Sequence, residues 1–394
     1  MSKKQSYYVQ SDLLILLVLF FSTSLIAIYS AQQLEQYEGR NFVVMQIVFF
    51  AAGTLICAAI QFLDMEQLYK ASVYIYIAGV LSLILLYISP TSIAEPINGA
   101  KSWFNRVPGL PFSVQPAEFV KLTTILYLSV VISKHKEKFE KHDLRSDFIL
   151  LIKLVAITAL PVGLIMLQPD FGTAMVYLFI LGMMIIFSGI SWKIIISLVI
   201  AISALLGSLL AFIVNFADLA KQIVGPGNAY QIDRILTWFD PTQSSEGANW
   251  HFDRAYMGLG SGQLSGKGIG GVEVYYPEAQ TDFIYSVIGE TFGFIGGAFV
   301  IFLFFLLLYK LVSLGLNIYK FVPFASYFCF GYLSLILVHV FQNIGMTIGI
   351  MPVTGIPLPL ISYGGSSVLS IMLGIGIIYR IAVELTIQND YLFK

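Results

Sequence analysis

Residues 282–309 read DFIYSVIGETFGFIGGAFVIFLFFLLLY, and this stretch decides the fold class. Its only charged side chains are Asp282 and Glu290, both in its first third. A helix needs about 20 mostly apolar residues to cross the hydrocarbon core of a bilayer. The stretch meets that requirement, and it therefore predicts a membrane-spanning helix.

Nine further apolar stretches of similar length occur along the chain. The first follows Lys3 and Lys4, but its apolar run is too long for a signal peptide, so we expect it to be retained. The sequence thus predicts an all-α polytopic membrane protein with about ten transmembrane helices, in which residues 1–394 form a single integral membrane domain. The predicted helices lie near 12–32, 43–63, 70–90, 116–133, 148–168, 171–189, 191–215, 282–309, 324–348 and 363–384.

The composition excludes several classes of protein. Hydrophobic residues make up 57% of the chain and charged residues only 11%, against about 25% in a soluble domain. This balance excludes a soluble enzyme, a disordered chain and a coiled coil. The net charge of −1 gives no overall excess of basic residues, so we expect no nucleic-acid partner. Cys57 and Cys329 lie far apart in apolar runs, which is typical of core residues and not of a disulfide or a metal site.

The distribution of Lys and Arg predicts the orientation of the chain. Basic residues gather in the loops on the side of the N-terminus, above all between Lys134 and Arg145. Because cytoplasmic loops are enriched in Lys and Arg, we expect a multi-pass membrane protein with both termini in the cytoplasm. Residues 216–281 then form one large extracytoplasmic loop between the seventh and eighth helices. Its aromatic residues, such as Trp250, indicate that the loop packs.

Charged residues inside apolar segments are rare, and they mark candidate sites. Glu118 and Lys121 stand three residues apart at the start of the fourth helix and so share one face. They could form a structural ion pair, or Lys121 could offer a cation to an anionic ligand while Glu118 positions it. Asp170, in the short turn before the sixth helix, is either an N-cap or a site residue on the same side of the membrane.

Two carboxylates stand where the long loop re-enters the membrane. Pro277 fits a first helical turn, which would place Glu278 and Asp282 four residues apart on one helix face. Asp282 is followed at once by apolar residues, and partial burial makes a carboxylate a better base; capping is the alternative role. Glu290 lies about 12 Å further along the helix, beyond the range of about 5–9.5 Å for paired glycosidase carboxylates, so we expect no hydrolase pair.

Two irregular segments complete the candidate sites. Residues 260–268, GSGQLSGKG, superficially look like a phosphate loop, but Gly268 stands where Ser or Thr should bind magnesium, so nucleotide binding is not expected. They form either a plain turn or a turn whose backbone N–H groups and Lys267 bind a lipid pyrophosphate. In residues 351–367, MPVTGIPLPLISYGGSS, three prolines alternate with apolar residues and cannot form a helix, and such backbone survives at membrane depth only against protein or a cavity. The histidines, among them His339, show no metal-ligand spacing and stay unassigned.

Taken together, these motifs resemble the shape, elongation, division and sporulation family, the RodA/FtsW proteins of the bacterial cell wall, over residues 12–384. The resemblance implies a ten-helix peptidoglycan glycosyltransferase that polymerises lipid II into glycan strands at the outer face of the cytoplasmic membrane during cell elongation. Within the family the chain looks closer to RodA than to FtsW. The segments that carry the resemblance are 99–104 (GAKSWF), 115–121 (QPAEFVK), 168–173 (QPDFGT), 260–268, 277–293 and 341–367.

The resemblance also implies roles for individual residues. The family's essential aspartate matches Asp282, its buried Glu/Lys pair matches Glu118 and Lys121, and the Asp before its Phe-Gly-Thr turn matches Asp170. The chain departs from the family pattern at four positions: Ala117 for Ser, Arg254 for Gln, Gln280 for His and Thr291 for Glu. Gln280 stands two residues before Asp282, and its substitution for His is expected to alter the hydrogen bonding of that carboxylate.

One mechanism fits both the residue chemistry and the resemblance. Asp282 is predicted to be catalytic and to deprotonate the sugar 4-hydroxyl that attacks a lipid-linked sugar. Lys121, helped by Lys267 or Arg254, would neutralise the departing pyrophosphate. A divalent cation such as Mg²⁺ could share this task, with Asp282 or Asp170 as its oxygen ligand. The predicted substrate-binding residues are Glu118, Lys121, Asp170, Lys267, Arg254 and Glu278.

The alternative function is a lipid II flippase or transporter, because ten helices with intramembrane charges and broken helices also describe that class. A flippase should place its charges along a path through both leaflets, whereas the carboxylates here gather on the outer side. Because the chain carries no crosslinking motif of its own, we expect a separate transpeptidase as partner. The resemblance names a class B penicillin-binding protein for that role and implies other cell-elongation membrane proteins as further partners. The transpeptidase could dock on phenylalanines that otherwise face lipid: Phe302, Phe304, Phe305, Phe324, Phe328 and Phe330.

Overall fold

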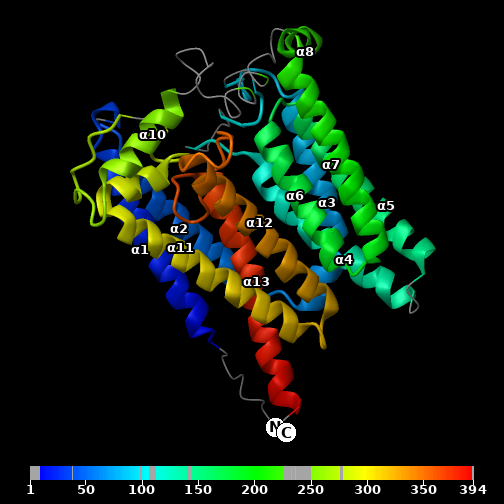
Figure 1. Cartoon of the computed structure of the whole chain (residues 1–394). Coiled ribbons are helices and arrows are strands. Elements are labelled where there is room, and N and C mark those ends of the chain that lie inside the picture. Colours follow the sequence, from blue (N-terminus) through cyan, green and yellow to red (C-terminus); the bar gives the residue numbers. More distant parts are fainter. Residues whose placement is uncertain are drawn as a thin grey trace.

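The computed structural model is a bundle of long helices (Figure 1). It describes residues 9–37, 39–97, 100–105, 112–139, 143–225, 232, 236, 250–275 and 278–392. Within these ranges the chain forms no extended strand, and its β structure is limited to two isolated bridges, Ile97 with Ala100 and Phe104 with Val114. The all-α fold class predicted from the sequence is confirmed.

Nine of the described helices are long and apolar enough to cross a membrane, and a shorter apolar helix, Phe171–Phe187, brings the number to the ten expected. The third helix begins at Met65, earlier than expected, because Asp64 at the N-cap and Gln67 in the first turn form a capping box. The helices are α1 (Ser11–Gln32), α2 (Phe42–Ile60), α3 (Met65–Ile88), α4 (Pro116–Lys138), α5 (Leu144–Met166), α6 (Phe171–Phe187), α7 (Trp192–Asn215), α11 (Ile284–Ile318), α12 (Pro323–Thr347) and α13 (Gly365–Leu392).

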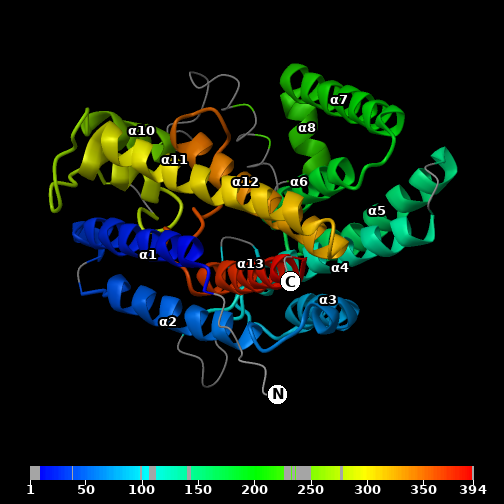
Figure 2. The same cartoon turned by 90° about the horizontal axis from the view of Figure 1, so that it is seen from below.

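The helices differ sharply in how much protein surrounds them. Of the most apolar 18 residues of each helix, 78% are buried in α4 and 72% in α12, whereas only 6% are buried in α7. Figure 2 shows α7 at the edge of the bundle and α13 in its interior. The inner helix α4 carries the buried charged residues Glu118 and Lys121, which lipid could not satisfy. Both cysteines are free thiols: Cys329 on α12 is buried, as expected of a core residue, whereas Cys57 on α2 is only half-buried.

The two ends of the bundle have different characters. α1 begins and α13 ends at the same end (Figure 1), and the opposite end holds the connections between α3 and α4, α7 and α11, and α12 and α13. In its described part, the long connection after α7 contains two short helices, α8 (Ala217–Val224) and α10 (Trp250–Ser261). α10 packs against α11, so this part of the predicted loop is folded. Trp238, another of the aromatic residues in the predicted loop, lies outside the described residues.

The glycine-rich turn after α10 docks onto a break in α11. Helical backbone geometry is interrupted at Gly293, with φ 64° and ψ −158°. The amide of Lys267 donates to the carbonyl of Glu290 at 2.9 Å. A Cβ on Gly266 would lie 2.1 Å from the Thr291 carbonyl oxygen, so only glycine permits this close approach. These glycines therefore serve packing against α11.

The proposed phenylalanine docking face is wrong for three of its six residues. Phe304, Phe324 and Phe328 are buried in the core. The ring of Phe304, for example, lies 4.9 Å from that of Phe20 on α1. Phe302 and Phe305 are exposed on α11. The sequence could not separate the buried phenylalanines from the exposed ones, because these parts of α11 and α12 are apolar on every face and show no helical periodicity.

Candidate functional site

A cavity of about 460 Å³ opens at the end of the bundle opposite the one where α1 begins and α13 ends. It lies where α4, α6 and α11 begin, and the segment between α12 and α13 forms another of its walls. Five of the residues predicted from the sequence line it: Glu118, Lys121, Asp170, Glu278 and Asp282. The fold therefore brings together charged residues that are spread over more than 160 positions of the chain (118 to 282).

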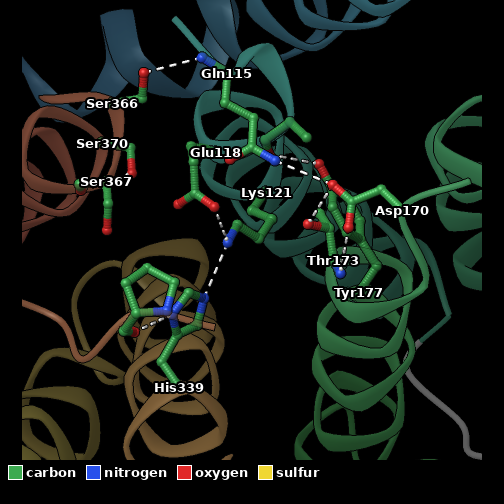
Figure 3. Close-up of polar contacts among 12 residues, drawn as sticks. Gln115, Glu118, Lys121, Asp170, Thr173, Tyr177, His339, Ser366, Ser367 and Ser370 are labelled. Atoms are coloured by element: carbon green, nitrogen blue, oxygen red, sulfur yellow. Dashed lines mark hydrogen bonds and ion pairs between the residues drawn. The ribbon is translucent and has the colours of Figure 1, made fainter. Parts of the chain in front are cut away.

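Glu118 and Lys121 form the predicted ion pair on the inner helix α4. Lys121 Nζ lies 2.8 Å from Glu118 Oε1, and only 2% and 5% of their side chains are exposed. Pro116 occupies the first turn, where a missing N–H costs nothing. Lys121 Nζ also lies 2.9 Å from Nε2 of His339 on α12 (Figure 3). Glu118 Oε2 is buried and has no hydrogen-bond partner among the described residues, so Lys121 is the main support of this carboxylate.

Asp170 is both a helix cap and a cavity residue. Its Oδ1 accepts from the backbone N–H of Thr173 at 3.1 Å, which caps α6. Its Oδ2 accepts from the Thr173 hydroxyl at 2.9 Å and from the Gln115 side-chain amide at 3.0 Å (Figure 3). The capping interaction and the site position, which were alternatives in the sequence, are thus combined in one side chain.

The segment before α11 differs from its prediction. Residues 278–283 form turns, and α11 begins at Ile284, so Glu278 and Asp282 do not share a helix face. Glu278 has a positive φ of 51°. The carbonyl of Asp282 accepts from the Asn343 side chain at 2.8 Å, and that of Gln280 accepts from the Tyr363 amide at 2.8 Å. Because neighbouring segments use these carbonyls, they are not available for helical hydrogen bonds. Pro277 lies outside the described residues.

The proline-rich segment between α12 and α13 packs against Asp282. Gly355 has a φ of +73°, and a Cβ there would lie 3.2 Å from Asp282 Oδ2. Glycine therefore suits this position both for its backbone conformation and for its closeness to the carboxylate. The predicted requirement for such backbone at membrane depth, contact with protein and a cavity, is met, since Thr354, Gly355, Ile356 and Pro357 line the cavity.

Gln280 and Tyr37 connect the cavity rim to the connection between α1 and α2. The Tyr37 hydroxyl donates to the Gln280 side chain and accepts from the Ala279 amide at 3.1 Å. Burial raises the pKa of the Tyr37 phenol to about 12, and the nearby Glu278 carboxylate adds to the shift. Gln280 Nε2 also donates to Glu278 Oε2 at 3.1 Å. The residue that departs from the family pattern thus holds Glu278 and Tyr37 together.

Two predicted substrate-binding residues do not line this cavity. Lys267 Nζ lies 2.7 Å from Oε1 of Glu290, which is fully buried, and 3.1 Å from Glu273. The hydrogen bond to Glu290 raises the pKa of the Lys267 ammonium. This lysine therefore fastens the glycine-rich turn to α11. Arg254 is exposed on α10. Their distance from the cavity results from the docking of α10 and the following turn on α11, which the sequence did not indicate.

Residues that the sequence analysis left unassigned complete the cavity. His339 lines it, and Gln115 and Asn343 bond to Asp170 and to the backbone of Asp282. A usable signal existed for His339 and Asn343, because they stand four residues apart inside an apolar segment and so share one helix face.

The comparisons with known proteins agree with this architecture. Residues 5–387 match the family model FTSW_RODA_SPOVE, described as cell cycle protein. The chain belongs to this family. Two relatives of this family member are each named "Probable peptidoglycan glycosyltransferase FtsW": that of Lactococcus lactis is 30% identical over 98% of this chain and 94% of its own length, and that of Bacillus subtilis 32% identical over 97% and 93%.

Solved structures share the fold of this family member. A chain from a structure described as "Structural coordination of polymerization and crosslinking by a peptidoglycan synthase complex" aligns with a TM-score of 0.76 at 26% identity, over 96% of this chain and 99% of that one. The rod shape determining protein RodA of Thermus thermophilus aligns with a TM-score of 0.66 at 25% identity, over 96% and 98%. The closer likeness to RodA expected from the sequence is not confirmed, because the relatives above carry the name FtsW.

Proposed function

We propose that this chain is a peptidoglycan glycosyltransferase that polymerises lipid II into glycan strands at the outer face of the bacterial cytoplasmic membrane. The observation that carries the proposal is the cavity that unites the Asp282 carboxylate with the buried pair of Glu118 and Lys121. The names of the family's relatives support the same activity. Purified protein given lipid II should form glycan chains, and their absence would contradict the proposal.

The proposed chemistry is a displacement at the anomeric carbon of a lipid-linked sugar. Asp282 accepts the proton of the attacking 4-hydroxyl, the new C–O bond forms, and the bond to the lipid pyrophosphate breaks with its electron pair. Attack from the face opposite the leaving group inverts an α-linked donor to a β-1,4 glycan. The half-buried position of Asp282 on the cavity wall is suited to this role, because a base must reach the substrate.

Lys121 is proposed to stabilise the leaving pyrophosphate. The developing negative charge would meet an ammonium that is fixed by Glu118 in a site that excludes most water. Glu118 holds the lysine, while Glu278 and Asp170 line the substrate cavity. Lys267 and Arg254 have no part in stabilising the leaving group, since neither lines the cavity.

A divalent cation such as Mg²⁺ would find few protein ligands in this site. Asp282 and Asp170 are the carboxylates considered for it, but the part of the chain that the structure describes gathers no three His, Cys, Asp or Glu side chains around one point. Both oxygens of Asp170 already accept hydrogen bonds from Thr173, and one also from Gln115. A cation here would therefore draw most of its coordination from substrate phosphate oxygens and water, as Mg²⁺ commonly does.

The flippase alternative makes a different demand on the structure. A flippase should line a path through both leaflets with polar groups, whereas the charged residues of this cavity lie together at one end of the bundle. Lipid II in sealed vesicles separates the two functions. Formation of glycan chains supports the polymerase, and transfer of unreacted lipid II between leaflets supports the flippase.

We predict that the cavity faces the outside and that both termini lie in the cytoplasm. In a background without Cys57 and Cys329, a cysteine at exposed Gln263 should react with an impermeant maleimide in intact cells. A cysteine at Asn389, exposed near the other end, should react only after permeabilisation. The reverse pattern would contradict the proposed orientation. Ser244, another suitable position in the same loop, lies outside the described residues.

We also predict a transpeptidase partner, a class B penicillin-binding protein, alongside other cell-elongation membrane proteins. New glycan needs crosslinks to bear load, and the complex that contains a similar chain is described as coordinating polymerization with crosslinking. The transpeptidase should co-purify from membranes, and polymerisation should be faster in the complex than alone. Full activity of the isolated chain without any co-purified transpeptidase would contradict this prediction.

A further inference from the structure

His339 occupies a position that fixes its protonation state. Its side chain is 1% exposed and lies between α4 and the proline-rich segment. Nε2 lies 2.9 Å from Lys121 Nζ, and Nδ1 lies 3.2 Å from the Pro357 carbonyl oxygen (Figure 3). An ammonium group can only donate, so Nε2 must accept, and Nδ1 must carry the proton that it donates to Pro357. The imidazole is therefore neutral, with both ring nitrogens engaged.

The segment that anchors the ring is itself held by α12. One turn after His339, the Asn343 side chain donates to the Ile356 carbonyl at 2.9 Å and to the Asp282 carbonyl at 2.8 Å. Asn343 and His339 thus donate hydrogen bonds to the successive carbonyls of Ile356 and Pro357. Asn343 also fixes the backbone of Asp282. The same face of α12 therefore contacts both residues that we assign to the reaction.

We propose that His339 is a positioning residue that holds the Lys121 ammonium toward the cavity, at a fixed place relative to Asp282. This inference rests on the proposed function. Lys121 has three N–H donors, of which Glu118 takes one and His339 a second, leaving one for an oxygen of the leaving pyrophosphate. Without His339, the ammonium keeps its bond to Glu118 and loses the contact that holds it from the side of α12.

The test compares His339→Leu, which removes the acceptor, with His339→Gln, whose amide can both accept from Lys121 and donate to Pro357. Tyr332→Phe is the matched control, because it removes another buried hydrogen bond of α12, to the Ile371 carbonyl at 2.8 Å, outside the cavity. The rate of glycan formation from lipid II and the binding of undecaprenyl pyrophosphate are measured. His339→Leu should lower kcat about 10- to 100-fold with KM little changed, as expected for a hydrogen bond to a charged group.

The same variant should bind undecaprenyl pyrophosphate more weakly, while His339→Gln and Tyr332→Phe stay close to the unchanged protein in both measurements. If His339→Leu does not fold, His339→Met, which is unbranched and adaptable, replaces it. Equal kcat and equal product binding in the Leu variant and the control would overturn the proposal. So would an equal loss in the Leu and Gln variants, since the ring would then act by packing. Failure of the unchanged protein to make glycan would instead contradict the proposed function.

Discussion

Replacing Asp282 by Asn or Ala is expected to abolish glycan polymerisation while leaving the protein folded. Both changes remove the carboxylate that takes the proton, and loss of a general base costs about 10²- to 10⁴-fold in rate. The fold should persist, because Asn343 binds the backbone carbonyl of Asp282, which both variants retain. The rate of lipid II polymerisation and the temperature of unfolding in detergent measure the two effects separately.

Two variants sharpen this experiment. Glu66→Gln, at an exposed position on α3 far from the cavity, should leave polymerisation unchanged. Substantial turnover by Asp282→Ala would indicate that the base is Glu278, the nearby carboxylate that also lines the cavity. In that event Glu278→Gln would abolish the activity that Asp282→Ala retained.

Removing either partner of the Glu118 and Lys121 pair should destabilise the protein more than removing both. Each single Ala variant leaves a charge in a site that is at most 5% exposed, which costs about 3–5 kcal/mol. Lys121→Ala should be the worse of the two, because the remaining Glu118 has a buried oxygen with no hydrogen-bond partner among the described residues, while the remaining Lys121 keeps His339. The double variant buries no charge. The free energy of unfolding of the two single variants and the double variant, measured by chemical denaturation, tests this order.

An exposed ion pair of the same chain provides the control. Lys70 and Glu66 lie 2.6 Å apart on α3, with 71% and 76% of their side chains exposed. Their removal, singly or together, should hardly change stability, because water solvates the charge that remains. Losses at Glu118 and Lys121 that simply add would mean that the two residues do not interact, contrary to the distance between them.

The sequence predicted the helices well because their formation is a local property. An apolar run of sufficient length is transferred into lipid as a helix whatever its neighbours are. The pairing of Glu118 with Lys121 was equally predictable, since three residues along a helix return to the same face. Asp170 at a helix start was recognisable for the same reason.

Predictions failed where a residue's role depends on a distant segment. The Pro277 signal suggested a helix through Glu278 and Asp282, but side chains and amides from α12 and the segment after it take the carbonyls of Gln280 and Asp282. Lys267 looked free to bind a phosphate, yet it pairs with Glu290 on the docked helix α11.

By itself, then, the sequence determined the membrane-spanning helices, the ion pair on α4 and the charged residues at one end of the bundle. Only the tertiary structure decided which of those residues share a cavity and which side chains hold them. His339 and Lys121 are 218 positions apart, and no spacing rule reaches that far. The physical reason is that helix formation satisfies each backbone within its own segment, whereas a buried charge must find its partners on whichever helix packs beside it.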